Sequence, residues 1–164
     1  MAQHWRLKTS TGGNHEHSIG KYCVDNGVAA MGWGLWAIHP QLASGKIQIG
    51  SFADYSYYNA MSSKYDNKQI GNVRRLAEET QKGDVIWIRN EYDRQYYRSV
   101  LPEDGSKLYR YDFSDNAGNY DACNRLVGLK WVQVDNNDIP EKVWRAFQGP
   151  RQTFCRITYY EDYV

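Results

Sequence analysis

Two tryptophans set among glycines are the most distinctive chemical feature of this 164-residue chain. The segment GWGLW places Trp33 and Trp36 beside Gly32 and Gly34, directly after a short apolar run. Glycine lets a flat ligand or another backbone approach closely, and base–aromatic stacking contributes about 1–3 kcal/mol per base. We therefore predict a slot for a planar ring with Trp33 as its wall. Trp36 is a candidate for the same slot, with packing in the core as the equal alternative.

The other tryptophans are expected to pack rather than to bind. Trp87 and Trp131 stand among apolar neighbours in VIWI and LKWV, and Trp5 and Trp144 are also assigned to packing. Aromatic residues make up 15% of the chain, with fourteen Tyr against four Phe. Such amphipathic rings suit interfaces and stacking surfaces, although a β-rich domain also uses Tyr widely on its strands.

Patterns that would indicate catalysis or metal binding are weak. The chain has no GxSxG, P-loop, GxGxxG or HExxH motif. Asp112 and Asp115 lie in a Ser/Asn/Gly-rich stretch, where Asp usually serves turns. His15 and His17 would point to different faces of a helix, and with Cys23 they show no evident fourth ligand. We expect no enzymatic activity, no metal and no cofactor.

Charge is unevenly distributed along the chain. The net charge of +1 argues against a strongly basic binder, but residues 125–156 hold six Lys or Arg against three Asp or Glu. Phosphate contacts are therefore expected in the last third. There Arg151 could clamp a phosphate, with Gln152 and Thr153 adding hydrogen bonds; a solvated surface turn is the alternative.

Cysteine usage and hydropathy predict a cytoplasmic protein. Cys23, Cys123 and Cys155 are widely separated and form no CxxC pair, as expected of reduced thiols. No segment approaches the length of a membrane span, and the polar first ten residues lack a signal-peptide core. The length fits one domain over residues 1–164.

The hydrophobic pattern predicts an α+β domain in which helices pack against one mixed, strongly curved β-sheet that closes partly into a barrel. Helices are expected from Asn14 to Gly27, from Asp66 or Asn67 to Gly83 with Ile70, Val73, Leu76 and Ala77 inside, and from Pro140 to Gly149. Strands are expected at 4–9, 28–33, 84–90, 95–101, 107–113 and 125–135, with loops at 34–54 and 114–124.

Four features resemble the YTH/EVE branch of the PUA-like superfamily, whose small domains read modified bases. Residues 7–33 look like the YTH opening, in which a strand ends in Lys-Ser and a later Gly-Val strand delivers a cage Trp. QKGDVIWIRN (81–90) is similar to an EVE helix-Gly-Asp-strand step, and residues 127–140 resemble the late YTH strand with Lys-Trp and Asp-x-Pro. The order of elements fits along nearly the whole chain.

The resemblance implies a PUA-like fold and a base-binding aromatic cage. It carries the cage Trp onto Trp33, and because loop 114–124 lacks the second cage Trp, Tyr120 is the substitute. Lys8, Thr9 and Ser10 fall on the family's Lys-Ser position, which contacts sugar, phosphate or base edge. Further candidates to line the same cleft, all at the end of the 84–90 strand, are Arg89, Asn90 and Tyr92.

Three functions remain open. The first is a reader of a modified, flipped DNA base, the targeting module of a modification-dependent restriction or defence system with a nuclease or NTPase fused or separate. The second is an RNA reader on the same fold, since RNA readers use unpaired bases and the 2′-OH. The third is a protein- or small-molecule-binding module that uses the Tyr-rich segment 54–65.

Overall fold

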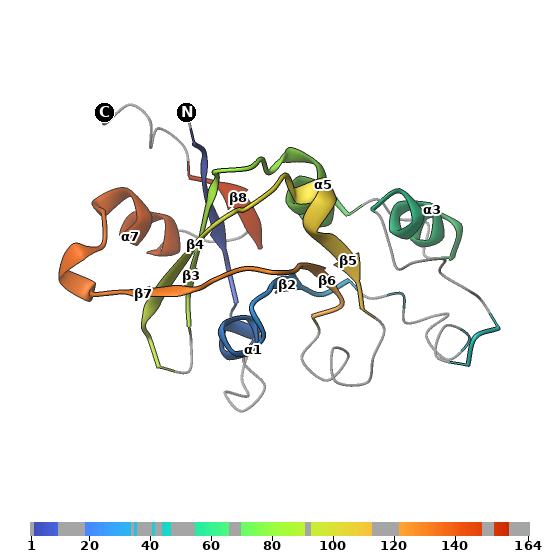
Figure 1. The fold of residues 1–164 in the computed structure, drawn as a ribbon, viewed down its shortest axis with the longest axis horizontal. Coiled ribbons are helices and arrows are strands. Elements are labelled where there is room, and N and C mark those ends of the chain that lie inside the picture. Colours follow the sequence, from blue (N-terminus) through green and yellow to red (C-terminus); the bar gives the residue numbers. More distant parts are fainter. Residues whose placement is uncertain are drawn as a thin grey trace.

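The chain folds into two β-sheets with helices around them (Figure 1). The computed structural model describes residues 2–9, 19–33, 35, 41, 44–46, 55–65, 70–90, 93–112, 122–148 and 153–157. Within these residues the fold is α+β, as the sequence predicts.

The larger sheet has five strands in the order β7-β4-β3-β1-β8. Its central pair, β1 (His4–Leu7) and β3 (Val85–Arg89), runs parallel. The neighbours β4 (Tyr96–Val100), β7 (Val132–Val134) and β8 (Phe154–Arg156) are antiparallel to the strands they adjoin. The sheet is therefore mixed, and its two parallel strands have their carboxyl ends at the same end of the sheet.

The smaller sheet has three antiparallel strands in the order β2-β6-β5. These are β2 (Ala29–Met31), β6 (Asn124–Leu126) and β5 (Tyr109–Tyr111). All three residues of β2 and of β6 are buried, and helical segments pack against the small sheet.

The expected single, partly closed barrel is wrong: the strands form two sheets. The predicted strand 125–135 divides between them, and its two parts are β6 and β7. Gly128 separates the parts with a φ of +74°, a left-handed conformation that glycine adopts without a Cβ clash. The Leu129 N–H donates to the Gly27 carbonyl at 2.9 Å, which ties this connection to the end of the first helix.

Of the three predicted helices, the first ends close to expectation and the last both begins and ends close to it; the predicted start of the first helix at Asn14 lies outside the described residues. Helix α1 (Ile19–Asn26) buries Ile19, Tyr22 and Cys23 and ends at Gly27, whose φ is +64°. Helix α7 (Glu141–Gln148) follows Pro140 and packs beside the five-stranded sheet (Figure 1).

The middle helix is α4 (Gly71–Arg74), which continues as the π-helix η3 (Arg75–Glu79). Its predicted inner residues Val73, Leu76 and Ala77 are fully buried. The step into β3 is organised by the buried Asp84 carboxylate, which accepts hydrogen bonds from Trp5 Nε1 and from the backbone N–H of Gln3 and Gln81, each at 3.0 Å. Asp84 therefore joins the end of the helical segment to the first two strands of the sheet.

Side chains from α4 and η3 contact the outer edge of β8. Asn72 Oδ1 accepts the Phe154 N–H, and Arg75 Nε donates to the Phe154 carbonyl, both at 3.0 Å. Arg75 Nη2 also donates to Asn72 Oδ1 at 2.7 Å. The sequence analysis did not predict β8, nor the helices α3 (Tyr55–Tyr65) and α5 (Gly105–Leu108).

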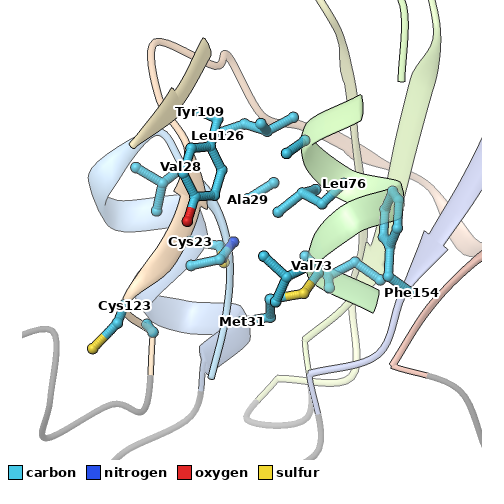
Figure 2. Close-up of a cluster of buried hydrophobic side chains, with 14 of the residues drawn as sticks. Cys23, Val28, Ala29, Met31, Val73, Leu76, Tyr109, Cys123, Leu126 and Phe154 are labelled. Atoms are coloured by element: carbon cyan, nitrogen blue, oxygen red, sulfur yellow. Dashed lines mark hydrogen bonds between the residues drawn. The ribbon is translucent and has the colours of Figure 1, made fainter. Parts of the chain in front are cut away.

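The hydrophobic core has two parts. The larger cluster lies where β2 and β6 face the helical segment 71–79; Figure 2 shows Met31 and Leu126 on one side and Val73 and Leu76 on the other. The smaller cluster lies under α7 and contains Val85, Trp87, Tyr96, Val143 and Ile157.

The tryptophans assigned to packing behave differently. Trp5 and Trp87 are buried as predicted, and Trp131 is partly buried with its Nε1 donating to the Val28 carbonyl at 2.9 Å. The prediction for Trp144 is wrong, since 49% of this residue is exposed. The buried side of α7 runs through Val143 and the partly buried Ala146 and Phe147, and at about 100° per residue Trp144 falls beside that stripe.

Candidate functional site

Trp33 lies on the surface at the end of a buried strand. It follows β2 and the buried Gly32, and 37% of it is exposed. Its φ is +57°, a left-handed conformation that is rare for a bulky residue. An exposed indole on an unusual backbone makes this position the starting point for a candidate site.

The backbone around Trp33, here called the Trp33 segment (residues 32, 33 and 35), is held by buried side chains from three elements. Tyr58 on α3 donates its hydroxyl to the Trp33 carbonyl at 2.6 Å. Asn124 on β6 donates through Nδ2 to the carbonyls of Gly32 at 2.6 Å and Trp33 at 3.3 Å. The Leu35 N–H donates to the Tyr111 hydroxyl on β5 at 2.7 Å.

These hydrogen bonds offset the cost of the backbone conformation. A left-handed conformation costs an L-residue about 1–2 kcal/mol, whereas each internal hydrogen bond contributes a net of about 0.5–1.5 kcal/mol. Three side chains that bind one short segment are therefore enough to keep Trp33 in this conformation. Strain that the surroundings impose in this way is a feature of binding sites.

Asn124 has its orientation fixed from both ends of the amide. The side chain is fully buried, and while Nδ2 donates to the Trp33 segment, Oδ1 accepts the hydroxyl of Tyr109. Exchanging the amide O and N would place oxygen against two carbonyls, so only one orientation satisfies all partners.

The tyrosines beneath Trp33 keep their protons. Burial raises the pKa of Tyr111, and the neighbouring Cys123 thiol adds to the rise while the Leu35 N–H opposes it. Burial also raises the pKa of Tyr109 well above its usual value. Tyr58 and Tyr111 stack at 5.5 Å between ring centroids, and Tyr55 meets Tyr109 edge-on at 6.0 Å. The Trp33 segment is thus hydrogen-bonded to a packed group of tyrosine rings, in which burial keeps Tyr109 and Tyr111 neutral.

A second group of predicted contact residues comes together at the carboxyl ends of the parallel strands. The strand-end cluster, as we call it, is held by two hydrogen bonds: Thr9 Oγ1 donates to the Arg89 carbonyl at 3.0 Å, and the Lys8 N–H donates to the Thr153 carbonyl at 2.7 Å. Its members are Lys8, Thr9, Arg89, Asn90 and Thr153.

Helix α1 packs closely against this cluster. A Cβ at Gly20 would lie 2.9 Å from Thr9 Oγ1 and 3.2 Å from Asn90 Oδ1, so glycine is needed for the contact. Thr9 and Asn90 are buried at this junction, whereas Lys8 is exposed. Thr9 and Asn90 therefore support the junction from within, and Lys8 is the cluster's exposed cation.

The sequence analysis missed Arg94, which lies in the turn from β3 to β4. It is exposed, has a φ of +58°, and donates its N–H to the Asn90 carbonyl at 2.6 Å. Among the described residues neither Arg94 nor Lys8 forms an ion pair. This end of the five-stranded sheet therefore carries two cations that can meet an anion.

The other predicted site residues lie outside the residues that the structure describes. They are Ser10, Trp36, Tyr92, Tyr120, Arg151 and Gln152. His15, His17 and Asp115, which were considered for catalysis or metal binding, also lie outside them.

Asp112, the other half of the weak carboxylate pair, faces Arg125 at 3.3 Å. Arg125 also donates to the Ala122 carbonyl at 2.7 Å and lies over the Tyr22 ring. Asp112 is therefore engaged in an ion pair that is largely buried on the Arg125 side. Across the described ranges, no group of three or more His, Cys, Asp or Glu is arranged to hold a metal ion, and no helix is long and apolar enough to cross a membrane.

The Tyr-rich segment 54–65 forms helix α3 over most of its length. Tyr55 and Tyr58 are buried in the larger core cluster, so these two rings face the interior. Tyr58 and Asn124 are the residues closest to Trp33 that the sequence analysis missed. Their only sequence signal is composition, since neither belongs to a motif.

Comparison with protein-family models, with curated proteins and with solved structures finds no match to this chain. What the chain does must therefore be argued from its own residues.

Proposed function

We propose that this chain is a non-catalytic nucleic-acid reader of the PUA-like type, which stacks a flipped base on Trp33. The observation that carries the proposal is the exposed Trp33 indole on a backbone fixed by Tyr58, Asn124 and Tyr111. A modified DNA base is the favoured ligand. In that role the chain would be the targeting module of a restriction or defence system, beside a fused or separate nuclease or NTPase.

The free energy of binding a flipped base favours a stacking residue that is held rigidly, as we propose for Trp33. Extruding a base costs a few kcal/mol, and stacking contributes about 1–3 kcal/mol. A flexible Trp would lose part of that gain in ordering its side chain. The hydrogen bonds to the Trp33 segment fix its backbone and so the direction in which the side chain leaves the chain, which reduces this loss and supports stacking as its role.

In this proposal the strand-end cluster contacts the phosphate backbone of the nucleic acid. Lys8 and Arg94 are exposed at the carboxyl ends of parallel strands, where α/β sheets commonly bind ligands. Contacts of this kind position the nucleic acid and add salt dependence without reading sequence.

The test is a binding panel of duplex and single-stranded DNA oligonucleotides with different base modifications, measured by fluorescence anisotropy. We expect one modified duplex to bind more tightly than its unmodified counterpart. Trp33→Ala should weaken that binding by about 5- to 150-fold, the equivalent of the stacking energy. Trp144→Ala is the matched control, because it removes an even more exposed tryptophan side chain elsewhere and should leave the preference intact.

Retained discrimination in Trp33→Ala would overturn the assignment of the stacking wall. A matched RNA competitor that binds better than DNA would favour the RNA reader, since RNA readers use unpaired bases and the 2′-OH. If no nucleic acid shows salt-dependent affinity, a protein- or small-molecule-binding module takes the place of this proposal.

The phosphate contact has a separate test. Lys8→Gln should weaken all oligonucleotides alike and reduce the slope of log Kd against log salt by about 1. Lys82→Gln is the control, because Lys82 is exposed just before β3, at the opposite end of the same sheet. Equal slopes for Lys8→Gln and the unaltered protein would remove Lys8 from the contact.

A further inference from the structure

The backbone conformation of Trp33 depends on groups that never reach the surface. Among the described residues, only Trp33 and Arg94 combine a side chain with a positive φ. Arg94 lies in a tight turn, whereas Trp33 follows a strand and has its carbonyl bound by two buried donors, Tyr58 and Asn124. The unusual conformation at Trp33 is thus maintained by contacts from distant parts of the chain.

We propose that Tyr58 and Asn124 are positioning residues, which hold Trp33 in its left-handed conformation and so keep the indole in the orientation that binds a planar ligand. The proposal rests on the function proposed above. It assigns a role in binding to two residues that have no contact with the ligand.

The pattern of hydrogen bonds supports a single conformation. Asn124 Nδ2 binds the carbonyls of Gly32 and Trp33, while the Leu35 N–H is bound to Tyr111. A change of φ and ψ at Trp33 turns these groups relative to one another, so the buried donors and acceptor cannot all keep their partners. An unpaired polar group in the interior is costly, and this cost disfavours other backbone conformations at Trp33.

The consequence for binding follows from the population of the competent state. When a site is competent for only a fraction of the time, the apparent Kd rises by the inverse of that fraction. If loss of one donor lets Trp33 leave its conformation nine-tenths of the time, binding weakens about tenfold. The affinity of the site therefore depends on Tyr58 as well as on Trp33.

Tyr58→Phe is the decisive variant, because it removes the hydroxyl and keeps the buried ring. Tyr55→Phe is its matched control: Tyr55 lies one turn earlier on α3, its ring belongs to the same cluster, and its hydroxyl is not among those that bind the Trp33 segment. The readouts are the Kd for the tightest oligonucleotide of the panel, the midpoint of urea unfolding, and the fluorine NMR signal of 5-fluorotryptophan at Trp33, assigned with Trp33→Phe.

We expect Tyr58→Phe to weaken binding about tenfold and to shift or split the Trp33 fluorine signal, while Tyr55→Phe changes neither. Asn124→Ser, if it folds, should act in the same direction. An unchanged Trp33 signal and unchanged Kd in Tyr58→Phe would overturn the proposal, as would equal effects in Tyr55→Phe. If the unaltered protein binds no nucleic acid, the proposed function fails, and the fluorine signal alone still decides whether Tyr58 positions Trp33.

Discussion

Two exposed tryptophans, Trp33 and Trp144, are supported in different ways. Trp33 follows a buried strand, and its backbone is bound by side chains of α3, β5 and β6. Trp144 lies on the two-turn helix α7, whose exposed face carries an Arg145–Glu141 ion pair at 2.6 Å. Exposed i, i+4 pairs contribute only about 0.3–0.5 kcal/mol.

The attachment of each element to the core also differs. Helix α7 rests on the smaller cluster through the fully buried Val143, and the buried Arg6 donates to its Ala146 carbonyl at 2.7 Å. The Trp33 segment rests on the larger cluster and its tyrosines. Exposure alone therefore does not separate the two tryptophans, whereas the number of elements that fix the backbone does.

The largest expected effect on stability is at alkaline pH, in the larger core cluster, where Cys23 of α1 is fully buried. Burial raises the pKa of Cys23 from 9.0 to about 12, while the Ala30 N–H and Arg125 act in the opposite direction. As the pH rises, the Cys23 thiol loses its proton in the unfolded chain before it does so in the folded protein. The contribution of Cys23 to stability is therefore full below about pH 9 and is lost progressively up to about pH 12. A pKa difference of this size corresponds to at most about 4 kcal/mol.

Urea unfolding followed by near-UV circular dichroism between about pH 8 and pH 11.5 measures this loss. Cys23→Ala should show a shallower decline than the unaltered protein over this range. Equal declines in the two proteins would mean that Cys23 does not contribute to the alkaline sensitivity.

The next largest effect is expected for Asn124→Leu, which keeps the volume and removes the amide. Gly32 and Tyr109 lose their hydrogen-bond partner in the interior, and we expect a loss of about 3 kcal/mol in the free energy of unfolding. Urea unfolding measures it. A loss below about 0.5 kcal/mol, the range of ordinary surface substitutions, would contradict the role given to Asn124.

Val143→Ala tests the attachment of α7. It removes two methyl groups from a fully buried side chain, and we expect a loss of about 2 kcal/mol. Relative to the unaltered protein, amide hydrogen exchange in the variant should speed up more in α7 than in β2 and β6, because the substitution affects only the smaller cluster. A uniform change across both clusters would show that the two parts of the core unfold together.

The smallest effect is expected for Trp144→Ala, which should change the free energy of unfolding by less than about 0.5 kcal/mol. The indole is half exposed and lies beside the buried stripe of α7. Thermal unfolding of the variant is the measurement. A loss above about 2 kcal/mol would place Trp144 in the packing of α7 and end the contrast with Trp33.

Where periodicity and glycine agree, the elements of this fold follow from the sequence. Val73, Leu76 and Ala77 repeat with helical spacing and are buried, and Gly27 ends α1 with a positive φ. Such local signals do not depend on the rest of the chain.

The sequence-based predictions are wrong where packing between distant parts of the chain determines the secondary structure. Residues 125–135 look like one strand, yet Gly128 turns the chain from one sheet into the other. A glycine inside a strand pattern can mark such a bend, so that signal was present. Helix α3 had no comparable signal, because Tyr favours strands by propensity and forms a helix here with Tyr55 and Tyr58 packed in the core.

The candidate site was predictable only in part. Trp33 stood out through its glycine neighbours, and Arg89 and Asn90 through their position at a strand end. Lys8 and Thr9 were predicted only from the resemblance to the YTH opening, and Thr153 only from the basic charge of the last third. The support from Tyr58 and Asn124 comes from positions 25 and 91 residues away in the chain. No local pattern records such a contact.

The outer edge of β8 has a consequence for the behaviour of the protein in concentrated solution. An open strand edge offers unpaired N–H and C=O groups to other chains and promotes aggregation. Here Asn72 and Arg75 bind both groups of Phe154, so two side chains take the place that a neighbouring strand would fill. The helical segment that carries them thereby blocks a strand of another molecule from pairing with β8 at Phe154.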